Sequence, residues 1–501
     1  MKLLNVDLTP EQYREAERDE RVRIVKRSLD SRRGVRYHTV MEVYDIGETV
    51  PQPDYRSDYK DCRNAEPVVI VGAGPAGLFA ALRALELGLK PVIVERGKAV
   101  TERKYDIAKL TKEHEVNPDS NWCFGEGGAG TYSDGKLYTR STKRGDVGAV
   151  LRKFIEHGAD EKILIDAHAH IGTDRLSPII AKMRQTVEEH GGEYHFGKRV
   201  TDIIVKDGTV GGVIDSEGNR YEGVAVILAT GHSARDIYHL FHRKGWLLEA
   251  KPFALGVRVE HPQELINTIQ YHTKNYSPLL PPAAYSLTTQ VDGHGVFSFC
   301  MCPGGIIVPA TTAEGYQVVN GMSNSKRNSP FANSGIAVTV GLNDVPEYAQ
   351  YGELALLRFQ EDVERNMYSA TGKNATAPAQ RLTDFCERRI TSKLGKNNYM
   401  GESVSASLHE LLPSFVAECL RQGFKNFDRK MRGFYTSEAS ILAVESRTSS
   451  PVRIPRGTDM QHPQLKGLYP CGEGAGYAGG IVSSAMDGMN VVENIAVGGW
   501  R

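Results

Sequence analysis

The alternation of apolar and polar residues near the N-terminus predicts a small separate unit. A helical pattern runs from about Pro10 to Asp19, and two alternating runs, RVRIVKRSL and RYHTVMEVYDI, predict strands on either side of SRRG. The polar, Pro-rich stretch TVPQPDYRSDYKDCRNAEP follows and is typical of a linker. We therefore expect a small α+β domain over residues 1–65.

From Pro67 onward the pattern changes to strand, glycine turn, helix and strand, in PVVIVGAGPAGLFAALRALELGLKPVIVERG. An amphipathic helix is expected at about Ser177–His190. It is followed by a meander of short strands with DG and EGN turns, and then by the buried strand VAVILATG. These elements predict the first part of an α/β domain over residues 66–250.

The chain then becomes β-rich, with runs such as ALGVRVE and GVFSFCMCPGGIIVPA. Helical patterns follow at about Tyr348–Tyr368 and Ser405–Gln422. We expect an inserted α+β cap domain over residues 251–430. The tail, GLYPCGEGAGYAGGIVSSAMDGMNVVENIAVGG, again reads as strand, glycine turn and helix. We expect residues 431–501 to return to the sheet of the first α/β part.

Composition narrows the functional classes. The 61 basic and 61 acidic residues balance, so no global field favours nucleic acid or an anionic membrane. The chain has no long apolar run and a charged start, which predicts no membrane association and a cytoplasmic location. The seven cysteines are scattered, without a CxxC or CxxxxC pair, which argues against a disulfide reductase.

A local basic run lies in the N-terminal unit. Between residues 21 and 36 there are seven basic residues against one acid, Asp30; they are Arg21, Arg23, Lys26, Arg27, Arg32, Arg33 and Arg36. Such a run is usually a solvated strand and turn. The alternative is a docking surface for RNA or for a protein.

A glycine motif between strand and helix carries the main chemical signal. Gly72 permits a tight turn, Gly74 lets the backbone approach a pyrophosphate, and Gly77 lets the helix pack on the strand. The N-terminus of that helix offers free N–H groups and a positive dipole end. Glu95 ends the next strand, where an acid accepts hydrogen bonds from a ribose. The motif predicts dinucleotide binding but does not separate FAD from NAD.

Two later segments favour FAD. The strand VILATG stops at small residues, and in the tail Gly472 and Glu473 end a short strand before a helix that begins near Ile481. Together the three segments resemble the glutathione-reductase-type flavoprotein superfamily, whose members bind an extended FAD. The resemblance implies that Glu95 holds the adenosine ribose and that Glu473, where many members have Asp, contacts the ribitol. It also implies that backbone N–H groups of Gly480 and Ile481 face the flavin.

Within that superfamily the chain resembles a bacterial family of FAD-dependent dehydrogenases with a small extra N-terminal domain. The motifs that carry this resemblance span the chain: SLDSRR, FGEGGAGTYSDGKL, HIGTDRL, ATGHSARDIY, KPFALGVRVEHPQ, FCMCPGG, VVNGMS, APAQRLTDF and CGEGAGYAGGI. It implies a Rossmann-like FAD-binding domain with an inserted cap.

The glycine-rich stretch from Phe124 to Leu137 lacks apolar periodicity, so we expect a loop that wraps the FAD; a flexible surface lid is the alternative. The expected cofactor-binding residues are Gly72, Ala73, Gly74, Pro75, Ala76, Gly77, Glu95, Arg96, Gly125, Gly127, Gly128, Ser133, Lys136, Val200, Ala229, Thr230, Gly231, Gly472, Glu473, Gly480 and Ile481.

Two close pairs invite a metal or redox interpretation. Cys300 and Cys302 are expected on one face of a strand, as buried structural thiols or, alternatively, as active-site or metal-binding groups. His168 and His170 have the same spacing, but no neighbouring acid or cysteine cluster completes a metal set, so no metal is predicted.

The predicted activity is an FAD-dependent oxidoreductase that moves a hydride between a small-molecule substrate and flavin N5. No second GxGxxG unit exists, so NAD(P)H is expected at most as a transient reductant. Three alternatives stay open: an RNA-modifying or RNA-docked flavoprotein that uses the basic N-terminal unit, a flavin monooxygenase, and a protein that holds FAD without turnover. The candidate catalytic residues are His232, Arg258 and Arg447, with Arg235, Glu260 and Glu445 as further substrate-facing candidates.

Overall fold

A computed structural model describes residues 1–32, 34–139 and 142–498 of the chain. The N-terminal unit is a three-stranded antiparallel sheet in the order β1-β3-β2, with one helix packed against it. The helix and the last two strands were expected. The first strand was not identified, although Leu4, Val6 and Leu8 alternate with Asn5 and Asp7. The alternation is short, and most of the side chains of β1 are exposed. The elements are β1 (Lys2–Leu8), α1 (Pro10–Arg18), β2 (Val22–Asp30) and β3 (Arg36–Val43).

A five-stranded parallel sheet in the order β22-β10-β4-β5-β6 forms the centre of the α/β part. The tail strand β22 pairs with β10, so the tail does return to this sheet, as expected. Because all five strands run in the same direction, their carboxyl ends meet at one edge. The strands are β4 (Pro67–Val71), β5 (Lys90–Val94), β6 (Glu193–His195), β10 (Ala225–Leu228) and β22 (Leu468–Pro470).

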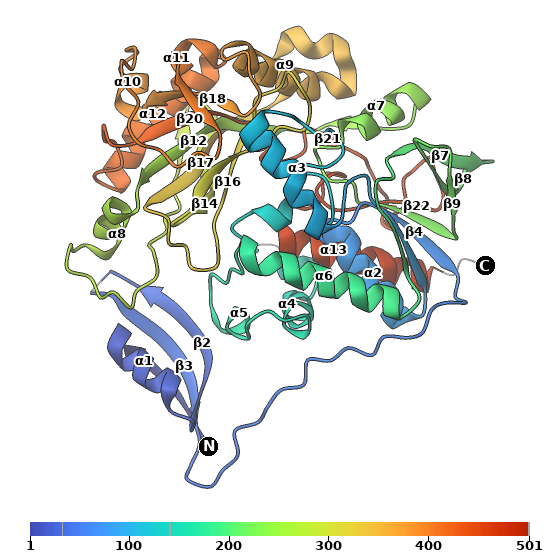
Figure 1. Cartoon of the computed structure of the whole chain (residues 1–501), viewed down its shortest axis with the longest axis horizontal. Helices are drawn as coiled ribbons and strands as arrows, with labels where there is room; N and C mark the ends of the chain where they lie inside the picture. The colour runs from blue at the N-terminus through green and yellow to red at the C-terminus, as the bar shows by residue number, and fades with distance from the viewer. Residues whose placement is uncertain (33, 140–141, 499–501) are drawn as a thin grey trace.

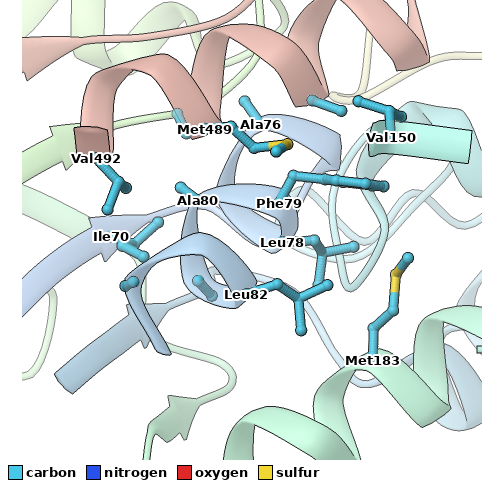
Figure 2. Close-up of a cluster of buried hydrophobic side chains, with 14 of the residues drawn as sticks. Ile70, Ala76, Leu78, Phe79, Ala80, Leu82, Val150, Met183, Met489 and Val492 are labelled. Carbon is cyan, nitrogen blue, oxygen red and sulfur yellow. The ribbon is translucent and has the colours of Figure 1, made fainter. Parts of the chain in front are cut away.

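Helices cover this sheet, and two of them cross in backbone contact. Figure 2 shows side chains of α2 packed with Met489 and Val492 of α13 on one side and with Met183 of α6 on the other. A Cβ added to Gly488 would lie 2.1 Å from the carbonyl oxygen of Ala76. The helices are α2 (Pro75–Leu87), α3 (Val100–Glu113), α4 (Val147–Glu156), α5 (Lys162–Ile165), α6 (Thr173–Glu189), α7 (Arg235–Lys244) and α13 (Ile481–Val497).

The expected meander is only partly present. Its first strand, β6, joins the parallel sheet instead, and the rest forms a separate three-stranded antiparallel sheet. That sheet consists of β7 (Val200–Lys206), β8 (Thr209–Asp215) and β9 (Arg220–Glu222). Helix α6 begins four residues earlier than expected, and helices α3 and α4 were not foreseen, because the glycine-rich loop between them made the whole region look irregular.

The second large body contains a seven-stranded sheet in the order β13-β14-β17-β12-β20-β18-β19, with its own hydrophobic core. Strand β20 pairs with both β12 and β18, so this sheet extends past residue 430, the expected end of the cap. Its strands are β12 (Phe253–Pro262), β13 (Thr288–Val291), β14 (His294–Cys302), β17 (Phe331–Val340), β18 (Thr376–Arg381), β19 (Glu402–Ser405) and β20 (Ser440–Glu445).

Helices and two short strand pairs complete the second body (Figure 1). None of the helices in the described part of the chain is long and apolar enough to cross a membrane. The remaining helices are α8 (Gln263–Tyr271), α9 (Ala355–Ser369), α10 (Leu382–Cys386), α11 (Leu408–Leu411) and α12 (Ser414–Lys430). The paired short strands are β11 (Glu249–Ala250) with β21 (Val452–Arg453), and β15 (Ile306–Pro309) with β16 (Val319–Met322).

Candidate flavin and substrate site

One cavity of about 1560 Å³ joins all three parts of the molecule. It begins at the carboxyl edge of the parallel sheet, passes the end of β14 in the second body, and reaches α1 and β2 of the N-terminal unit. All of the expected cofactor-binding residues lie in the described part of the chain. Of these, Ala73, Gly77 and Gly127 do not line the cavity, and the others do.

The turn between β4 and α2 depends on its glycines. Gly72 has φ +103°, and an added Cβ would lie 2.5 Å from the carbonyl oxygen of Ala229. A Cβ on Gly77 would lie 1.9 Å from the carbonyl oxygen of Gly72. Gly77 therefore packs against the backbone of the turn and does not line the cavity. Gly74 caps α2 without a side-chain hydrogen bond, and Pro75 follows. The first N–H groups of α2 therefore stay available to an anion in the cavity.

Glu95 ties two backbone segments of the site together. Its buried carboxylate accepts hydrogen bonds from the backbone N–H groups of Ala73 (2.8 Å), Gly97 (2.8 Å) and Gly125 (3.0 Å). A carboxylate has about four lone-pair positions, so one is left for a hydroxyl of a ligand. Its neighbour Arg96 also lines the cavity.

The glycine-rich loop is clamped from behind by Arg103 of α3. This fully buried guanidinium donates to the carbonyl oxygens of Asn121 (2.7 Å), Trp122 (2.8 Å), Glu126 (2.9 Å) and Gly128 (2.8 Å). Burial lowers the pKa of Arg103. The residue was missed from the sequence, although its position on the apolar stripe of α3, with Val100, Ile107 and Leu110, was a usable signal.

Glu126 supports the same loop from its other side. Its buried carboxylate accepts from the backbone N–H of Val100 (2.7 Å) and from Nε of Arg184 (2.9 Å). Gly125, Gly127 and Gly128 all have positive φ, which fits glycine. The loop is therefore held by internal contacts along this part, which a freely moving lid would lack.

The tail provides a second helix N-terminus, that of α13. A Cβ added to Gly231, Gly479 or Gly480 would meet no atom within 4 Å, and all three residues line the cavity. Space for a ligand therefore lies directly in front of α13. The turn at Gly472 is fixed by Asp487, which accepts from its N–H (2.7 Å) and pairs with Arg456 (2.6 Å). Asp487 was not identified from the sequence.

Glu473, the expected ribitol contact, lines the cavity beside His232. The carboxylate of Glu473 lies 3.6 Å from Nδ1 of His232. Both side chains are partly exposed there. The imidazole and the carboxylate therefore face each other where a ligand can reach them.

Ser133 and Lys136, two of the expected cofactor-binding residues, have different surroundings. Ser133 donates to the carbonyl oxygen of Gly130 (2.8 Å) and accepts from Gly135 N–H (3.0 Å). Lys136 bridges to the second body, where its ammonium donates to the carbonyl oxygen of Met301 and lies 4.0 Å from Asp134. Burial disfavours the ionised form of Asp134, but Arg327 and Lys136 outweigh it and lower the pKa of Asp134.

The candidate catalytic residues separate into two groups. His232 and Arg447 line the cavity, and Arg447 donates to Ser233 (3.1 Å) and Thr312 (2.9 Å) while pairing with Glu364 (3.2 Å). Arg235 does not line the cavity but pairs with the same Glu364 at 2.8 Å.

Arg258, by contrast, does not line the cavity. It is fully buried and bonded to Glu445 (2.8 Å), Asn333 (2.9 Å) and the carbonyl oxygen of Cys300 (2.6 Å). It therefore supports the strand end that forms the wall. Glu445 and Glu260 are also outside the lining, and burial raises the pKa of Glu260 to about 8.

The prediction that Cys300 and Cys302 share one face of a strand is wrong. A bulge between Phe299 and Cys302 breaks the alternation, and Cys300 has φ +45°. Cys300 is exposed at the cavity, whereas Cys302 is buried, and burial raises the pKa of Cys302 to about 12. Within the described residues no group of three or more metal-ligating side chains is placed to hold an ion.

The histidines of the other close pair both line the cavity. The ring of His168 lies 5.2 Å from that of Tyr138, and Nε2 of His170 lies 3.3 Å from the carbonyl oxygen of Ser325. Burial lowers the pKa of His170. These contacts give both residues ordinary hydrogen-bonding and packing partners in the wall.

The carboxyl edge of the parallel sheet carries two helix N-termini and a glycine-rich turn, and this arrangement defines a dinucleotide-binding protein. Comparison with known proteins identifies the dinucleotide as FAD. Residues 67–103 match the family model described as FAD binding domain, and residues 252–448 match the model described as FAD-dependent protein, C-terminal domain-like. The chain is an FAD-binding flavoprotein.

The chain belongs to the same family as a protein of Clostridium beijerinckii described as an uncharacterized protein. The two are 39% identical over 495 residues, which is 95% of this chain and 92% of that protein.

More distant likenesses come from solved structures. CtdE in complex with FAD is 11% identical with a TM-score of 0.35, over 87% of this chain and 84% of that chain. A geranylgeranyl bacteriochlorophyll reductase-like protein from Thermoplasma acidophilum is 13% identical with a TM-score of 0.35, over 87% of this chain and 79% of that chain. The flavin-dependent brominase Bmp2 is 14% identical with a TM-score of 0.33, over 87% and 79%.

Proposed function

We propose that this protein is an FAD-dependent oxidoreductase that exchanges a hydride between FAD and an organic substrate bound in the same cavity. The observation that carries the proposal is the continuity of that cavity, which runs from the N-termini of α2 and α13 to the wall formed by Lys136 and Cys300. Bound FAD supplies the hydride exchange at its N5 position. The chain positions the reactants and controls protons and water.

The residues around the cavity divide these tasks among them. The free N–H groups at the start of α2 hold the pyrophosphate, and Glu95 holds the adenosine ribose. The N–H groups of Gly480 and Ile481 face the flavin ring, where they stabilise negative charge. His232 accepts or returns a proton at its Nε2 atom, because its Nδ1 atom faces the Glu473 carboxylate at 3.6 Å.

We further propose that NAD(P)H, where it serves as reductant, enters through the same cavity. The sequence has a single strand–GxGxxG–helix unit. With no second nucleotide domain, a nicotinamide has to reach the flavin from the substrate side. It then binds transiently, before the substrate does.

The first experiment identifies the flavin and its reductant. The purified protein is examined by visible spectroscopy, the released flavin is identified by chromatography, and NADH or NADPH is then added without oxygen. Rapid bleaching of bound FAD supports a nicotinamide-fed reductase, and FAD that stays oxidised supports a substrate dehydrogenase. Absence of any flavin after reconstitution contradicts the proposal.

A pair of variants connects the flavin to the cavity. Gly479→Val introduces a side chain into open cavity space without a positive φ, so bound FAD should fall several-fold. Gly211→Val makes the same change in strand β8, where an added Cβ also meets no atom within 4 Å. Unchanged FAD in the first variant would place the flavin elsewhere, because the second controls for the substitution itself.

A further inference from the structure

The cavity continues beyond the proposed flavin position into a space that we call the distal chamber. It lies between the N-terminal unit and the second body and is lined by Tyr13, Leu29, Tyr37, Tyr271, Leu280 and Tyr285. Tyr13 and Tyr37 pack against each other with ring centroids 4.6 Å apart. Half of the chamber wall thus comes from a unit outside both large bodies, which in Figure 1 lies beside α5 and α8.

The N-terminal unit is fixed in this position by contacts to both bodies. The guanidinium of Arg27 forms a bidentate pair with Asp166 (Nη2 to Oδ2, 2.9 Å), and Ala167 N–H donates to the carbonyl oxygen of Arg27 at 3.1 Å. Glu17 pairs with Lys162 at 2.8 Å. On the other side, Ser277 donates to Glu11 at 2.7 Å. These contacts hold the edge strand β2 against the rim of the cavity.

The charges around the distal chamber favour an anion. The acidic residues that line this part of the cavity are Glu17, Asp134 and Asp166, and each is paired with a basic side chain. Lys326 is an exposed residue that lines the same cavity, and its ammonium has no carboxylate partner among the described residues. An anionic group in the cavity that reaches Lys326 therefore meets a positive charge without an acidic partner.

The chamber is lined mainly by aromatic rings. Tyr285 contributes to this wall with only 7% of the residue exposed, and its hydroxyl oxygen is buried beside Ser334. The aromatic walls on both sides suit a flat apolar body.

We propose that the N-terminal unit forms the outer wall of the substrate site and that the substrate is an organic acid with an aromatic body. Its body lies between the tyrosines of the distal chamber, with the acid group near Lys326. The reacting end points back past Cys300 towards the flavin. The last statement rests on the proposed function, whereas the chamber and its preference for an anion do not.

The test uses purified, FAD-containing protein and two related fluorescent probes. One is 8-anilinonaphthalene-1-sulfonate, an aromatic anion, and the other is N-phenyl-1-naphthylamine, the same aromatic body without the sulfonate. Fluorescence titration should show at least tenfold tighter binding of the anion. Equal affinity for the two probes, or no binding of the anion, overturns the proposed substrate class.

Three variants locate the probe. Ser28→Trp fills the chamber from strand β2 and should weaken anion binding at least tenfold. Val25→Trp makes a similar change at an exposed position of the same strand outside the lining and should have no effect. Lys326→Gln should weaken binding of the anion several-fold and leave the neutral probe unchanged.

Two results separate this inference from the proposed function. If FAD content and flavin reduction are normal but Ser28→Trp binds the probe like the parent protein, the inference is wrong and the proposed function stands. If the probes follow the expected pattern but no flavin reduction is found with any donor, the chamber stands and the proposed function fails. Thermal melting of each variant excludes unfolding as the cause.

Discussion

The guanidinium of Arg103 donates to the carbonyl oxygen of Gly128 at 2.8 Å, which links the buried face of α3 to the loop that lines the cavity. The backbone at Gly128 has φ +60°, and a Cβ there would lie 3.0 Å from Cα of Gly74 in the cofactor turn. A charge buried without an acidic hydrogen-bond partner is costly. The cost of burying the Arg103 charge is offset by several carbonyl oxygens that accept its hydrogen bonds. Because some of these carbonyl groups belong to the glycine-rich loop, the conformation of the loop depends on α3.

We expect Arg103→Met to lose bound FAD and to lower the free energy of unfolding by at least about 3 kcal/mol, because several buried carbonyl oxygens lose their donor. Thermal melting and the ratio of flavin to protein absorbance measure the two effects. Lys104→Met, at an exposed neighbouring position of α3, is the control and should change neither. Full FAD retention in Arg103→Met would contradict the role assigned to this contact.

The crossing of α2 and α13 yields a second prediction. Gly488→Ala should release FAD and destabilise the protein, because the added methyl would lie 2.1 Å from the carbonyl oxygen of Ala76 and must push the two helices apart. Helix propensity alone predicts the opposite effect on stability, because replacing glycine by alanine inside a helix raises the free energy of unfolding by about 1 kcal/mol.

Gly148→Ala in α4 is the matched control for this substitution. Its added methyl would lie 3.0 Å from the flexible guanidinium of Arg152 and 3.0 Å from Oδ1 of the capping residue Asp146, and no backbone atom outside its own helix lies closer than 3.8 Å. It should be neutral or slightly stabilising. Equal melting temperatures for the two variants would show that the helices can separate at no cost.

The residues in these two predictions also show which parts of the site could be identified from the sequence. The glycines of the β4–α2 turn were identified because strand, turn and helix are adjacent in the chain. Arg103 and Asp487 were missed because the backbone groups that accept from or donate to them lie at least 15 residues away, and no sequence pattern displays such contacts. Strand β20 was placed in the wrong body for a similar reason, since its partners β12 and β18 are distant in sequence.

Glu260 provides a prediction about pH. Burial raises the pKa of Glu260 to about 8, and its only described hydrogen bond is from Asn398 N–H at 2.8 Å. In the unfolded chain a glutamate ionises near pH 4.3, so between these values the native protein holds a proton that the unfolded chain has lost. Its contribution therefore lowers the free energy of unfolding as pH rises, by up to about 1.4 kcal/mol per pH unit.

Glu260→Gln removes this dependence, because glutamine has nearly the same shape and cannot ionise. The difference in melting temperature between variant and parent should therefore shift in favour of the variant between pH 5 and pH 8. Glu264→Gln, at an exposed position of α8, is the control and should leave the pH profile unchanged. A constant difference across this range would mean that Glu260 is already ionised in the folded protein.

The basic run of the N-terminal unit is largely engaged in ion pairs. Arg21 pairs with Asp19 at 2.9 Å, Arg32 with Asp30 at 2.6 Å, and Arg27 with Asp166. Arg33 lies outside the described residues. RNA docking stays a hypothesis, and its test is salt-dependent binding of an RNA oligonucleotide that disappears when residues 1–65 are deleted.

The Arg27–Asp166 pair leads to a prediction about docking of the N-terminal unit. Arg27→Asp places two carboxylates together, so the unit should detach and the amide of Ala167, which donates to the carbonyl oxygen of Arg27, should exchange its hydrogen faster. Combining Arg27→Asp with Asp166→Arg restores opposite charges and should recover much of the protection from exchange. Hydrogen-exchange mass spectrometry of the peptide around residues 162–170 measures this protection.

Arg32→Asp is the control. It disturbs a local pair with Asp30 and should leave the exchange of that peptide unchanged. Unchanged exchange in Arg27→Asp would show that the other contacts hold β2 in place, since mobility of the edge strand would expose the Ala167 amide directly.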